Sequence, residues 1–401
     1  MLDPQPWLIG LAILGGHFGF WLLLFNRFNA TGLARYVIKR IEKLIVLLSL
    51  VIPILVCTVA WKPLSEWFIA GDRWWPTGSP LFTAWGWFSL TAAIILGPLW
   101  LFSRRHLIPP THLLSQRSQH HDVARACNQQ LIIDKKFRAC ARLPFNQITQ
   151  LEVTEKELCL PRPISGIDGL KIGHISDIHL TGKISQDYYR FTFDRLLEGK
   201  PDLIVIAGDI IDYDRCLPWI QPLLGQLQAP LGCSYVLGNH DRRLSNIAPL
   251  IAQLQQLGFH DLGQLDQHIQ LPSGASLWLT GNELPWFQRG LATSETRDPT
   301  APPRADELRL GISHSPDQIG WARRRQLDLM LAGHTHGGQI RLPLIGPLVA
   351  PSHYGSQFAS GLFYLKPTLM HVSRGLSGVH PFRWLCPPEI SILTLRNPAT
   401  G

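Results

Sequence analysis

The sequence has few charged residues. Only 16% of its 401 residues are Asp, Glu, Lys or Arg, whereas soluble domains have about a quarter. The deficit lies in the first hundred residues, which are mostly apolar and contain nine of the fourteen tryptophans. This composition excludes an ordinary soluble domain there and is typical of membrane spans with interfacial aromatic residues. The remaining length is sufficient for a full-sized second domain.

Paired cysteines are also lacking. The seven cysteines are odd in number, and no two of them have Cys-x-x-Cys spacing. Neither a disulfide framework nor a zinc knuckle is therefore expected, and a reducing compartment is the more natural location. The chain also has no basic patch interleaved with aromatic residues. Its net charge of +8 comes largely from basic residues beside apolar runs, where topology and anionic headgroups explain them. No nucleic-acid partner is expected.

Three apolar runs cover about residues 7–25, 44–61 and 81–102, each near the roughly 20 residues that cross a bilayer. No positive charge precedes the first run, so it is not a typical signal peptide. Basic residues follow the first and third runs, and the positive-inside rule then puts the amino terminus outside and everything after Phe102 in the cytoplasm. Residues 1–105 are thus expected to be a multi-pass anchor in the inner (plasma) membrane.

Three smaller features of this anchor lead to further predictions. His17 is expected to make a polar contact between helices, and Gly15 and Gly19 form a small-xxx-small pair that hints at helix packing. The segment 33–43 is either an amphipathic helix on the inner leaflet or a loop that carries topology charges.

Residues 106–165 are expected to form a connector, in which QRSQHHDVARA is polar and QLIIDKKFRA more strand-like. From 166 to 397, short β-rich apolar runs alternate with helix-like segments, which predicts an α/β domain. Each apolar run ends in polar residues, at the carboxyl end of a strand, where open α/β sheets bind ligands.

Five of these strand ends carry Asp, His or Asn. They lie in LKIGHISDIHL, PDLIVIAGDIID, CSYVLGNHD, LRLGISHSPD and LDLMLAGHTHGG, and they supply Asp177, His179, Asp209, Asp212, Asn239, His240, Asp241, His314, His334 and His336. Singly, each has a structural explanation, such as a helix cap or a core histidine. Together they predict a metal site without thiolates, suited to Mn, Fe or Zn and an activated water.

The ordered series DIH, GDIID, GNHD, SHSPD and GHTHGGQ resembles the calcineurin-like metallophosphoesterase family, over about Leu170 to Arg396. GHTHGGQIRLP and the terminal SRGLSG…PFRWLCPPEI resemble its membrane-anchored bacterial branch. The resemblance implies a four-layer αββα sandwich with two divalent metal ions, preceded here by a three-helix transmembrane anchor.

The resemblance also implies roles. Asp177, His179 and His336 would bind one metal ion, and Asn239, His314 and His334 the other. Asp209 would bridge them, and a hydroxide between the metals would attack phosphorus in line. His240 would approach the scissile phosphate without binding metal, with Asp241 or Asp212 orienting it; the sequence leaves that choice open.

Glycines and arginines near the motifs complete the expectations. Gly208, Gly238 and Gly333 precede ligands at sharp turns, and the backbone is expected to turn at Thr335 so that His334 and His336 reach neighbouring ions. Arg374 is a candidate phosphate contact. Arg242 and Arg243 either meet an anionic headgroup or are solvated, and at least one of them is expected to be solvated. The segment Glu283 to Leu308 is a lid or a membrane-facing insertion, in which Trp286 and Phe287 either enter the interface or pack.

These expectations describe a membrane-anchored phosphohydrolase, a phosphodiesterase or pyrophosphatase rather than a monoesterase. Its partners are the membrane and a phosphate ester, for which a lipid-linked molecule and a soluble nucleotide both stay open. The specific alternative is the UDP-2,3-diacylglucosamine pyrophosphatase of lipid A synthesis. A non-catalytic scaffold or sensor is disfavoured, because such relatives lose ligands and this chain keeps all of them.

Overall fold

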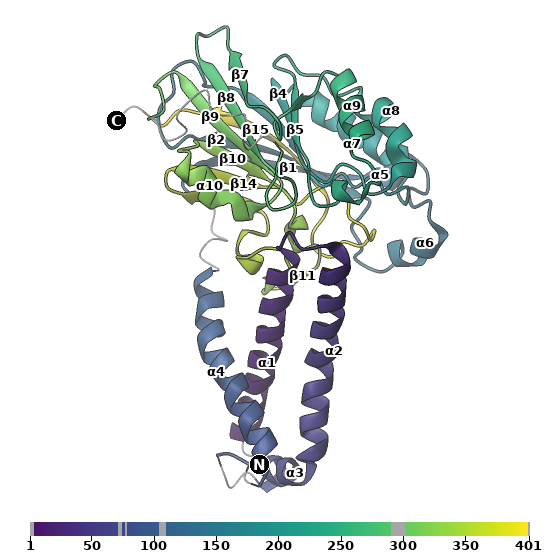
Figure 1. The fold of residues 1–401 in the computed structure, drawn as a ribbon, viewed down its shortest axis with the longest axis vertical. Helices are drawn as coiled ribbons and strands as arrows, with labels where there is room; N and C mark the ends of the chain where they lie inside the picture. Colours follow the sequence, from purple (N-terminus) through teal and green to yellow (C-terminus); the bar gives the residue numbers. More distant parts are fainter. Residues whose placement is uncertain (1–3, 71–73, 77, 104–109, 290–301, 400–401) are drawn as a thin grey trace. The chain divides into compact units, whose positions relative to one another are not determined.

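The computed structural model describes residues 4–70, 74–76, 78–103, 110–289 and 302–399 (Figure 1). The chain divides into two compact units, Met1–Ile108 and Pro109–Gly401. We describe each unit by itself.

The first unit contains three helices that are long and apolar enough to cross a membrane, as the sequence predicts. They are α1 (Gln5–Asn29), α2 (Arg35–Val59) and α4 (Pro80–Ser103), and a shorter helix, α3 (Trp61–Ala70), follows α2. At most 17% of the most apolar window of each long helix is buried, so the remaining apolar surface requires a non-aqueous environment. Because α2 begins at Arg35, segment 33–43 is mainly the first turns of this helix and not a separate element.

A buried histidine joins the three long helices. His17 Nδ1 accepts a hydrogen bond of 3.0 Å from the Trp85 indole, and its Nε2 lies 3.0 Å from the Ser49 carbonyl oxygen. This confirms the expected polar contact between helices. Of the expected pair, Gly19 faces Leu96 of α4 at ordinary contact distance, whereas a Cβ on Gly15 would meet nothing. Gly16 is the residue that packs tightly, since a Cβ there would collide with the Ser89 carbonyl of α4.

Two sheets form the second unit. The seven-stranded sheet has the order β1-β2-β15-β3-β4-β5-β6, and the six-stranded sheet has the order β13-β14-β10-β9-β8-β7. The strands of the first are β1 (Leu113–Asp122), β2 (Gln150–Cys159), β3 (Lys171–Ile175), β4 (Leu203–Ala207), β5 (Cys233–Val236), β6 (His260–Asp261) and β15 (Glu389–Arg396). Those of the second are β7 (Gln267–Gln270), β8 (Ser276–Asn282), β9 (Glu307–Ser313), β10 (Leu329–Ala332), β13 (Gly361–Leu365) and β14 (Thr368–Val372). A separate hairpin pairs β11 (Arg341–Leu342) with β12 (Gly346–Pro347).

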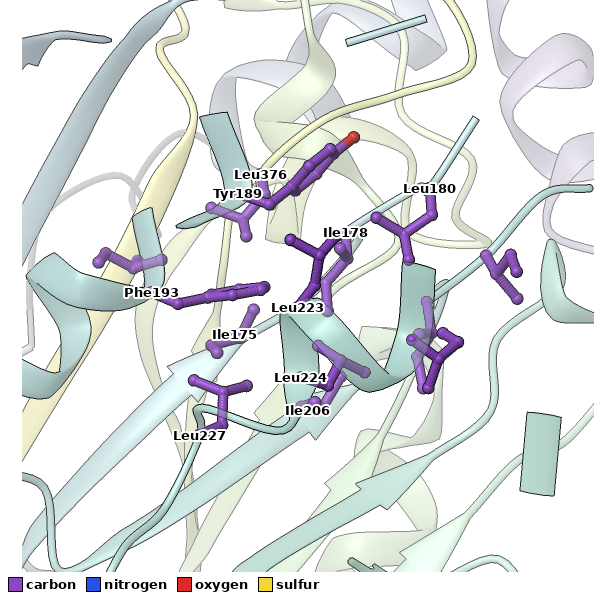
Figure 2. Close-up of a cluster of buried hydrophobic side chains, with 14 of the residues drawn as sticks. Ile175, Ile178, Leu180, Tyr189, Phe193, Ile206, Leu223, Leu224, Leu227 and Leu376 are labelled. Carbon is purple, nitrogen blue, oxygen red and sulfur yellow. The ribbon is translucent and has the colours of Figure 1, made fainter. Parts of the chain in front are cut away.

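Helices cover the outer face of each sheet. On the seven-stranded sheet lie α7 (Gln186–Glu198), α8 (Ile220–Leu224) and α9 (Ala248–Gln256), and on the six-stranded sheet lies α10 (Ile319–Arg324) (Figure 1). Side chains of α7 and α8 such as Phe193 and Leu223 pack on Ile175 and Ile206 of the strands (Figure 2). A second apolar cluster, which includes Val205 and Leu310, fills the space between the sheets. The unit is therefore the expected four-layer αββα sandwich.

The segment expected to be a connector belongs to this sandwich. Its polar part forms β1, which pairs with β2 in antiparallel register from His121–Leu151 to Leu113–Leu158. The part that looked more strand-like instead contains α6 (Lys135–Ala141), after the short α5 (Val123–Ala126). The second unit thus begins before residue 166, and only residues 104–109 separate α4 from the described part of it.

Candidate metal centre

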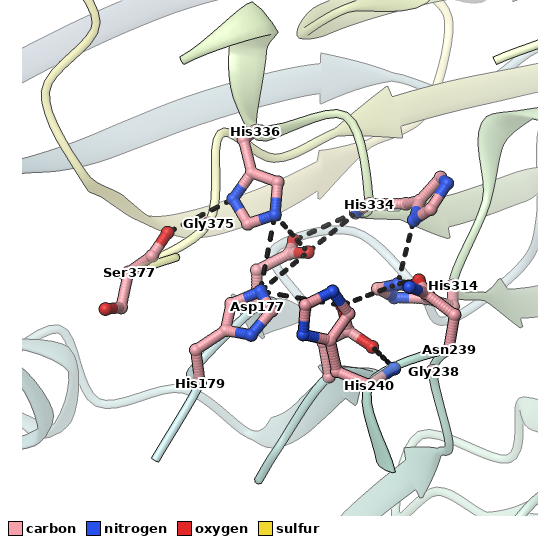
Figure 3. Close-up of polar contacts among 12 residues, drawn as sticks. Asp177, His179, Gly238, Asn239, His240, His314, His334, His336, Gly375 and Ser377 are labelled. Atoms are coloured by element: carbon pink, nitrogen blue, oxygen red, sulfur yellow. Dashed lines mark hydrogen bonds and ion pairs between the residues drawn. The ribbon is translucent and has the colours of Figure 1, made fainter. Parts of the chain in front are cut away.

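The candidate site lies where strands of both sheets end. Asp177, Asp209 and Asn239 follow β3, β4 and β5 of one sheet, and His314 and His334 follow β9 and β10 of the other. Within each sheet these strands run parallel to one another, so their carboxyl ends share one edge. The structure brings the side chains at these strand ends together (Figure 3).

The first group of candidate ligands is Asp177, His179, Asp209 and His336. His179 Nε2 lies 3.5 Å from Asp209 Oδ2 and 3.9 Å from Asp177 Oδ1. His336 Nε2 lies 3.5 Å from the same Asp177 oxygen and 3.3 Å from His179 Nε2. Four potential ligand atoms therefore face one point.

The second group is Asp209, His314 and His334. His314 Nε2 lies 3.2 Å from Asp209 Oδ2, 3.2 Å from His334 Nδ1 and 3.1 Å from Asn239 Oδ1. Asp209 belongs to both groups, and the structure therefore brings together all seven predicted ligands around one shared carboxylate. That they bind metal stays a prediction.

The backbone of these residues is in an unusual conformation. Asp177, His179, Asp209, His334 and His336 all have φ between +49° and +72°, a region that residues with side chains rarely adopt. Such strained positions concentrate at functional sites. The chain turns at Thr335, which has right-handed helical angles (φ −81°, ψ −12°) between two histidines in the left-handed conformation.

At two positions the backbone passes so close to a candidate ligand that only glycine fits. Gly208 has φ +82°, and a Cβ on it would lie 2.6 Å from His314 Nδ1. A Cβ on Gly333 would lie 2.5 Å from Asp177 Oδ2. Any larger residue would push a candidate ligand aside, which explains these glycines better than ordinary turn formation.

Hydrogen bonds fix how the imidazoles are oriented. The Nδ1 atoms of His179, His314 and His336 lie 2.8, 2.8 and 3.1 Å from the Asp212 carboxylate, the Ala207 carbonyl and the Ser377 carbonyl, respectively. Because these oxygens only accept, Nδ1 of His179 and Nδ1 of His314 donate to them, while Nδ1 of His336 also lies 3.3 Å from the Arg383 guanidinium. The three Nε2 atoms face the cluster, which is the arrangement that metal-binding histidines use. Burial lowers the pKa of His179 and of His314, but Asp212 and Asp209, respectively, raise it above the usual value, to about 9 for His314, so a cation bound at these Nε2 atoms would displace a proton.

One buried atom of the cluster tests whether cations fit there. Asp209 Oδ2 is buried and has no hydrogen-bond partner among the described residues. Burial alone would raise the pKa of the Asp209 carboxyl, but the nearby His314 and His240 lower it by more. The pKa of this carboxyl is therefore well below its usual range. Burial holds the pKa of His334 and His336 well below the usual value, so both are neutral imidazoles. An anionic carboxylate and uncharged imidazoles are the donors that divalent Mn, Fe or Zn prefers.

The choice between Asp212 and Asp241 is settled by their contacts. Asp212 Oδ1 lies 2.6 Å from His240 Nδ1, so Asp212 holds the imidazole. Asp241 instead accepts backbone N–H bonds from Ile210, Ile211 and Gly238. Asp241 therefore fixes the loops that carry Asp209 and Asn239, and its expected contact with His240 is not found.

The arginine that reaches the site is Arg243, whereas the Arg242 side chain is exposed. Arg243 Nη1 lies 2.6 Å from Asp212 Oδ1, and its Nη2 donates to His240 Nε2 at 2.7 Å. Since that nitrogen accepts, His240 is neutral; burial is the main reason that its pKa falls to about 4.

Arg374 does not face the candidate ligands with its guanidinium. It forms ion pairs of 2.7 Å with Glu152 and 3.0 Å with Glu389. Those two carboxylates balance the positive charge of the Arg374 guanidinium, so the expected contact of Arg374 with phosphate is not supported.

Two residues contact the site although sequence reasoning gave them no role there. The Trp286 ring lies 4.7 Å from the His334 ring and 5.3 Å from the His314 ring, centroid to centroid, so Trp286 packs against the second group.

Arg383 is fully buried and donates to the carbonyls of Ser377, Gly375 and Arg374 beside His336. The only sequence signal for Arg383 was its position in PFRWLCPPEI. Phe287 packs on the core of the seven-stranded sheet. Residues 290–301 of the expected lid lie outside the described residues, and its last two residues, Glu307 and Leu308, begin β9.

Comparison with known proteins agrees with this geometry. The family model for calcineurin-like phosphoesterases matches residues 170–338. The metallophosphoesterase YkuE of Bacillus subtilis is 32% identical over 257 residues, which are 63% of this chain and 87% of that protein. Phosphodiesterase YaeI of Escherichia coli is 29% identical over 232 residues, 56% of this chain and 82% of YaeI. The UDP-2,3-diacylglucosamine pyrophosphatase LpxG of Chlamydia trachomatis is 25% identical over 300 residues, 61% of this chain and 88% of LpxG.

The extent of these matches, together with the cluster of His and Asp side chains, defines the protein's class. The chain belongs to the calcineurin-like metallophosphoesterase family and is a metal-dependent phosphoric ester hydrolase.

Proposed function

We propose that the protein is a membrane-anchored, two-metal phosphodiesterase or pyrophosphatase. One observation carries this proposal: the buried Asp209 Oδ2 lies 3.5 Å from His179 Nε2 and 3.2 Å from His314 Nε2, between two groups of ligands. A carboxylate shared in this way is what a two-metal site requires. Two divalent ions bound there supply an activated water and neutralise charge on the phosphoryl oxygens.

The residues beside the cluster would act on the substrate. In the proposed mechanism Arg243 leaves His240 Nε2 when substrate binds and pairs with a phosphoryl oxygen, since a guanidinium matches phosphate geometry. His240 then faces the leaving oxygen. Once Arg243 has left, Nε2 would take up a proton from solvent and give it to the leaving oxygen, which returns His240 to the neutral form; Asp212 on the opposite nitrogen stabilises the imidazolium between these two steps.

A lipid-linked substrate is the substrate class that we propose. Three candidate spans would keep the enzyme at a bilayer, and a relative with 25% identity is named as a UDP-2,3-diacylglucosamine pyrophosphatase. An anchored enzyme and an anchored substrate search for each other in two dimensions, which favours their encounter. From the basic residues beside the spans we propose an inner-membrane location with the second unit in the cytoplasm.

The test is a substrate screen with the full chain in lipid nanodiscs and with Mn, Fe and Zn varied. We expect hydrolysis of bis-p-nitrophenyl phosphate and of a pyrophosphate-linked lipid such as UDP-2,3-diacylglucosamine, with little activity on p-nitrophenyl phosphate. The matched control is Asp209→Asn, which preserves side-chain shape. Hydrolysis by the wild type that Asp209→Asn does not reduce would contradict the mechanism, and hydrolysis of soluble diesters alone would remove the lipid-linked substrate.

A further inference from the structure

An exposed apolar patch lies next to the metal centre on the second unit. The tip of the β11–β12 hairpin consists of Pro343, Leu344 and Ile345, all exposed, and the Leu344 side chain is fully so. The hairpin follows directly after His336–Gly338, which places its base at the candidate ligand His336.

Two other segments extend this patch. Arg341 N–H donates to the Trp384 carbonyl at 3.0 Å, and Trp384 also forms isolated bridges with Ile340 and Asn146. The neighbours of those residues, Leu385, Phe145 and Leu143, are exposed, and 73% of Phe145 is accessible. We define the patch as Leu143, Phe145, Leu344, Ile345 and Leu385.

The backbone of the patch adds a second, independent observation. Phe145, Leu344 and Leu385 have φ of +64°, +62° and +50°. For bulky side chains the left-handed region is strongly disfavoured. Each residue thus adopts an unfavourable backbone conformation and also exposes apolar surface to water. Such outliers indicate a role outside the folded core.

Basic residues border the patch. Lys135 and Lys136 at the start of α6 and Arg142 at its end are exposed, and the chain leads from Arg142 directly into Leu143 and Phe145. Figure 1 shows α6 and β11 at the same end of the second unit. Apolar tips bordered by Lys and Arg are complementary to an anionic bilayer surface, where the apolar residues enter the acyl boundary and the cations meet headgroups.

We propose that this patch docks the second unit onto an anionic lipid bilayer, with the metal centre at the headgroup level. Residues 104–109 alone join α4 to Pro110, and a six-residue tether reaches at most about 25 Å. A bilayer that holds the spans is therefore always within reach, which favours it over a diffusing protein partner. The inference depends on the membrane anchor and not on the proposed hydrolysis.

The experiment uses the full chain in lipid nanodiscs, with a dansyl-bearing amino acid in place of Leu344. The matched control carries the same amino acid at Leu265, another exposed leucine (55% accessible), between β6 and β7. In discs with phosphatidylglycerol and brominated lipid we expect blue-shifted, bromine-quenched emission at 344 and neither effect at 265. Replacing Lys135, Lys136 and Arg142 by Glu should reduce the quenching at 344 while the melting temperature stays unchanged.

Two results would overturn the proposal. Emission at 344 that resembles emission at 265 would show that the hairpin stays in water. A blue shift without bromine quenching, seen only in discs that hold two copies, would assign the patch to a second copy of the chain. Both readouts are independent of activity, so they distinguish failure of docking from failure of the proposed hydrolysis.

Discussion

Asp212 lies 2.6 Å from His240, carboxylate oxygen to Nδ1. The other oxygen of the same carboxylate lies 2.8 Å from Nδ1 of His179. One side chain therefore orients both a candidate metal ligand and the histidine that we assign to the leaving oxygen. The two functions of the site are coupled through it.

Asp212→Asn should weaken both functions together. The amide has one acceptor oxygen, so one of the two imidazoles faces an N–H donor instead and loses its orientation. Metal affinity should fall about 10–100-fold, and kcat should fall even with saturating Mn. Competition with a fluorescent chelator and turnover of bis-p-nitrophenyl phosphate measure the two effects. Unchanged values for both would show that Asp212 does not orient these rings.

The pair Arg243→Ala and Arg242→Ala distinguishes two adjacent arginines. Arg243 contacts His240 and Asp212, whereas Arg242 is exposed. Removing a donor to the developing charge of a transition state costs about 10²–10³-fold in kcat, and we expect an effect of that order for Arg243→Ala. Arg242→Ala should retain nearly full kcat and metal content. The reverse ranking would support a substrate contact by Arg242.

Arg374→Met should affect stability much more than chemistry. It leaves the carboxylates of Glu152 and Glu389 without one of their cations, and breaking such a buried pair costs about 3–5 kcal/mol. Arg190→Met is the control, because the Arg190–Asp187 pair is exposed on α7 and such pairs contribute about 1 kcal/mol or less. Thermal unfolding in nanodiscs measures both. A stable Arg374→Met protein with a raised KM would restore the phosphate-contact hypothesis.

Trp286→Ala should disturb the second group of ligands. Loss of the indole opens a void against His314 and His334, with a stability cost of about 3–5 kcal/mol, and the two rings gain freedom. We expect lower metal occupancy by elemental analysis and a lower melting temperature. Trp286→Phe keeps an aromatic ring at the same place and should preserve most of both. Full occupancy in Trp286→Ala would show that the indole only fills space.

The site was predictable because its chemistry follows the strand pattern. Parallel strands bring their carboxyl ends to one edge, so motifs far apart in the chain can be combined without knowing their distances. The roles of Arg374 and Asp212 were not predictable in this way. Glu152, a partner of Arg374, lies 222 residues away. Asp241 is next to His240 in sequence, whereas Asp212, which contacts the ring, is 28 residues away.

The fold was predictable except where a strand lacks apolar residues. Hydrophobic periodicity misses β1, because this edge strand exposes nearly all its side chains and is held by backbone pairing with β2. The apolar stretch that follows β1 led to the opposite error, because it looked strand-like and forms no strand of either sheet. Leu131 and Ile132 are buried in the core, yet beyond an isolated bridge from Ile132 to Ile184 the chain turns into α6. Burial there comes from packing rather than from a sheet.

Metal stoichiometry of the wild type and of Asp209→Asn tests the central claim most directly. Both proteins are stripped with a chelator, and Mn binding to each full chain is measured by calorimetry. If Asp209 is shared by the two groups, the wild type binds two Mn per chain and gains thermal stability, as a ligand specific to the native state must give. Asp209→Asn then binds at most one Mn and lacks activity. Two Mn bound by Asp209→Asn with full hydrolysis would contradict the account.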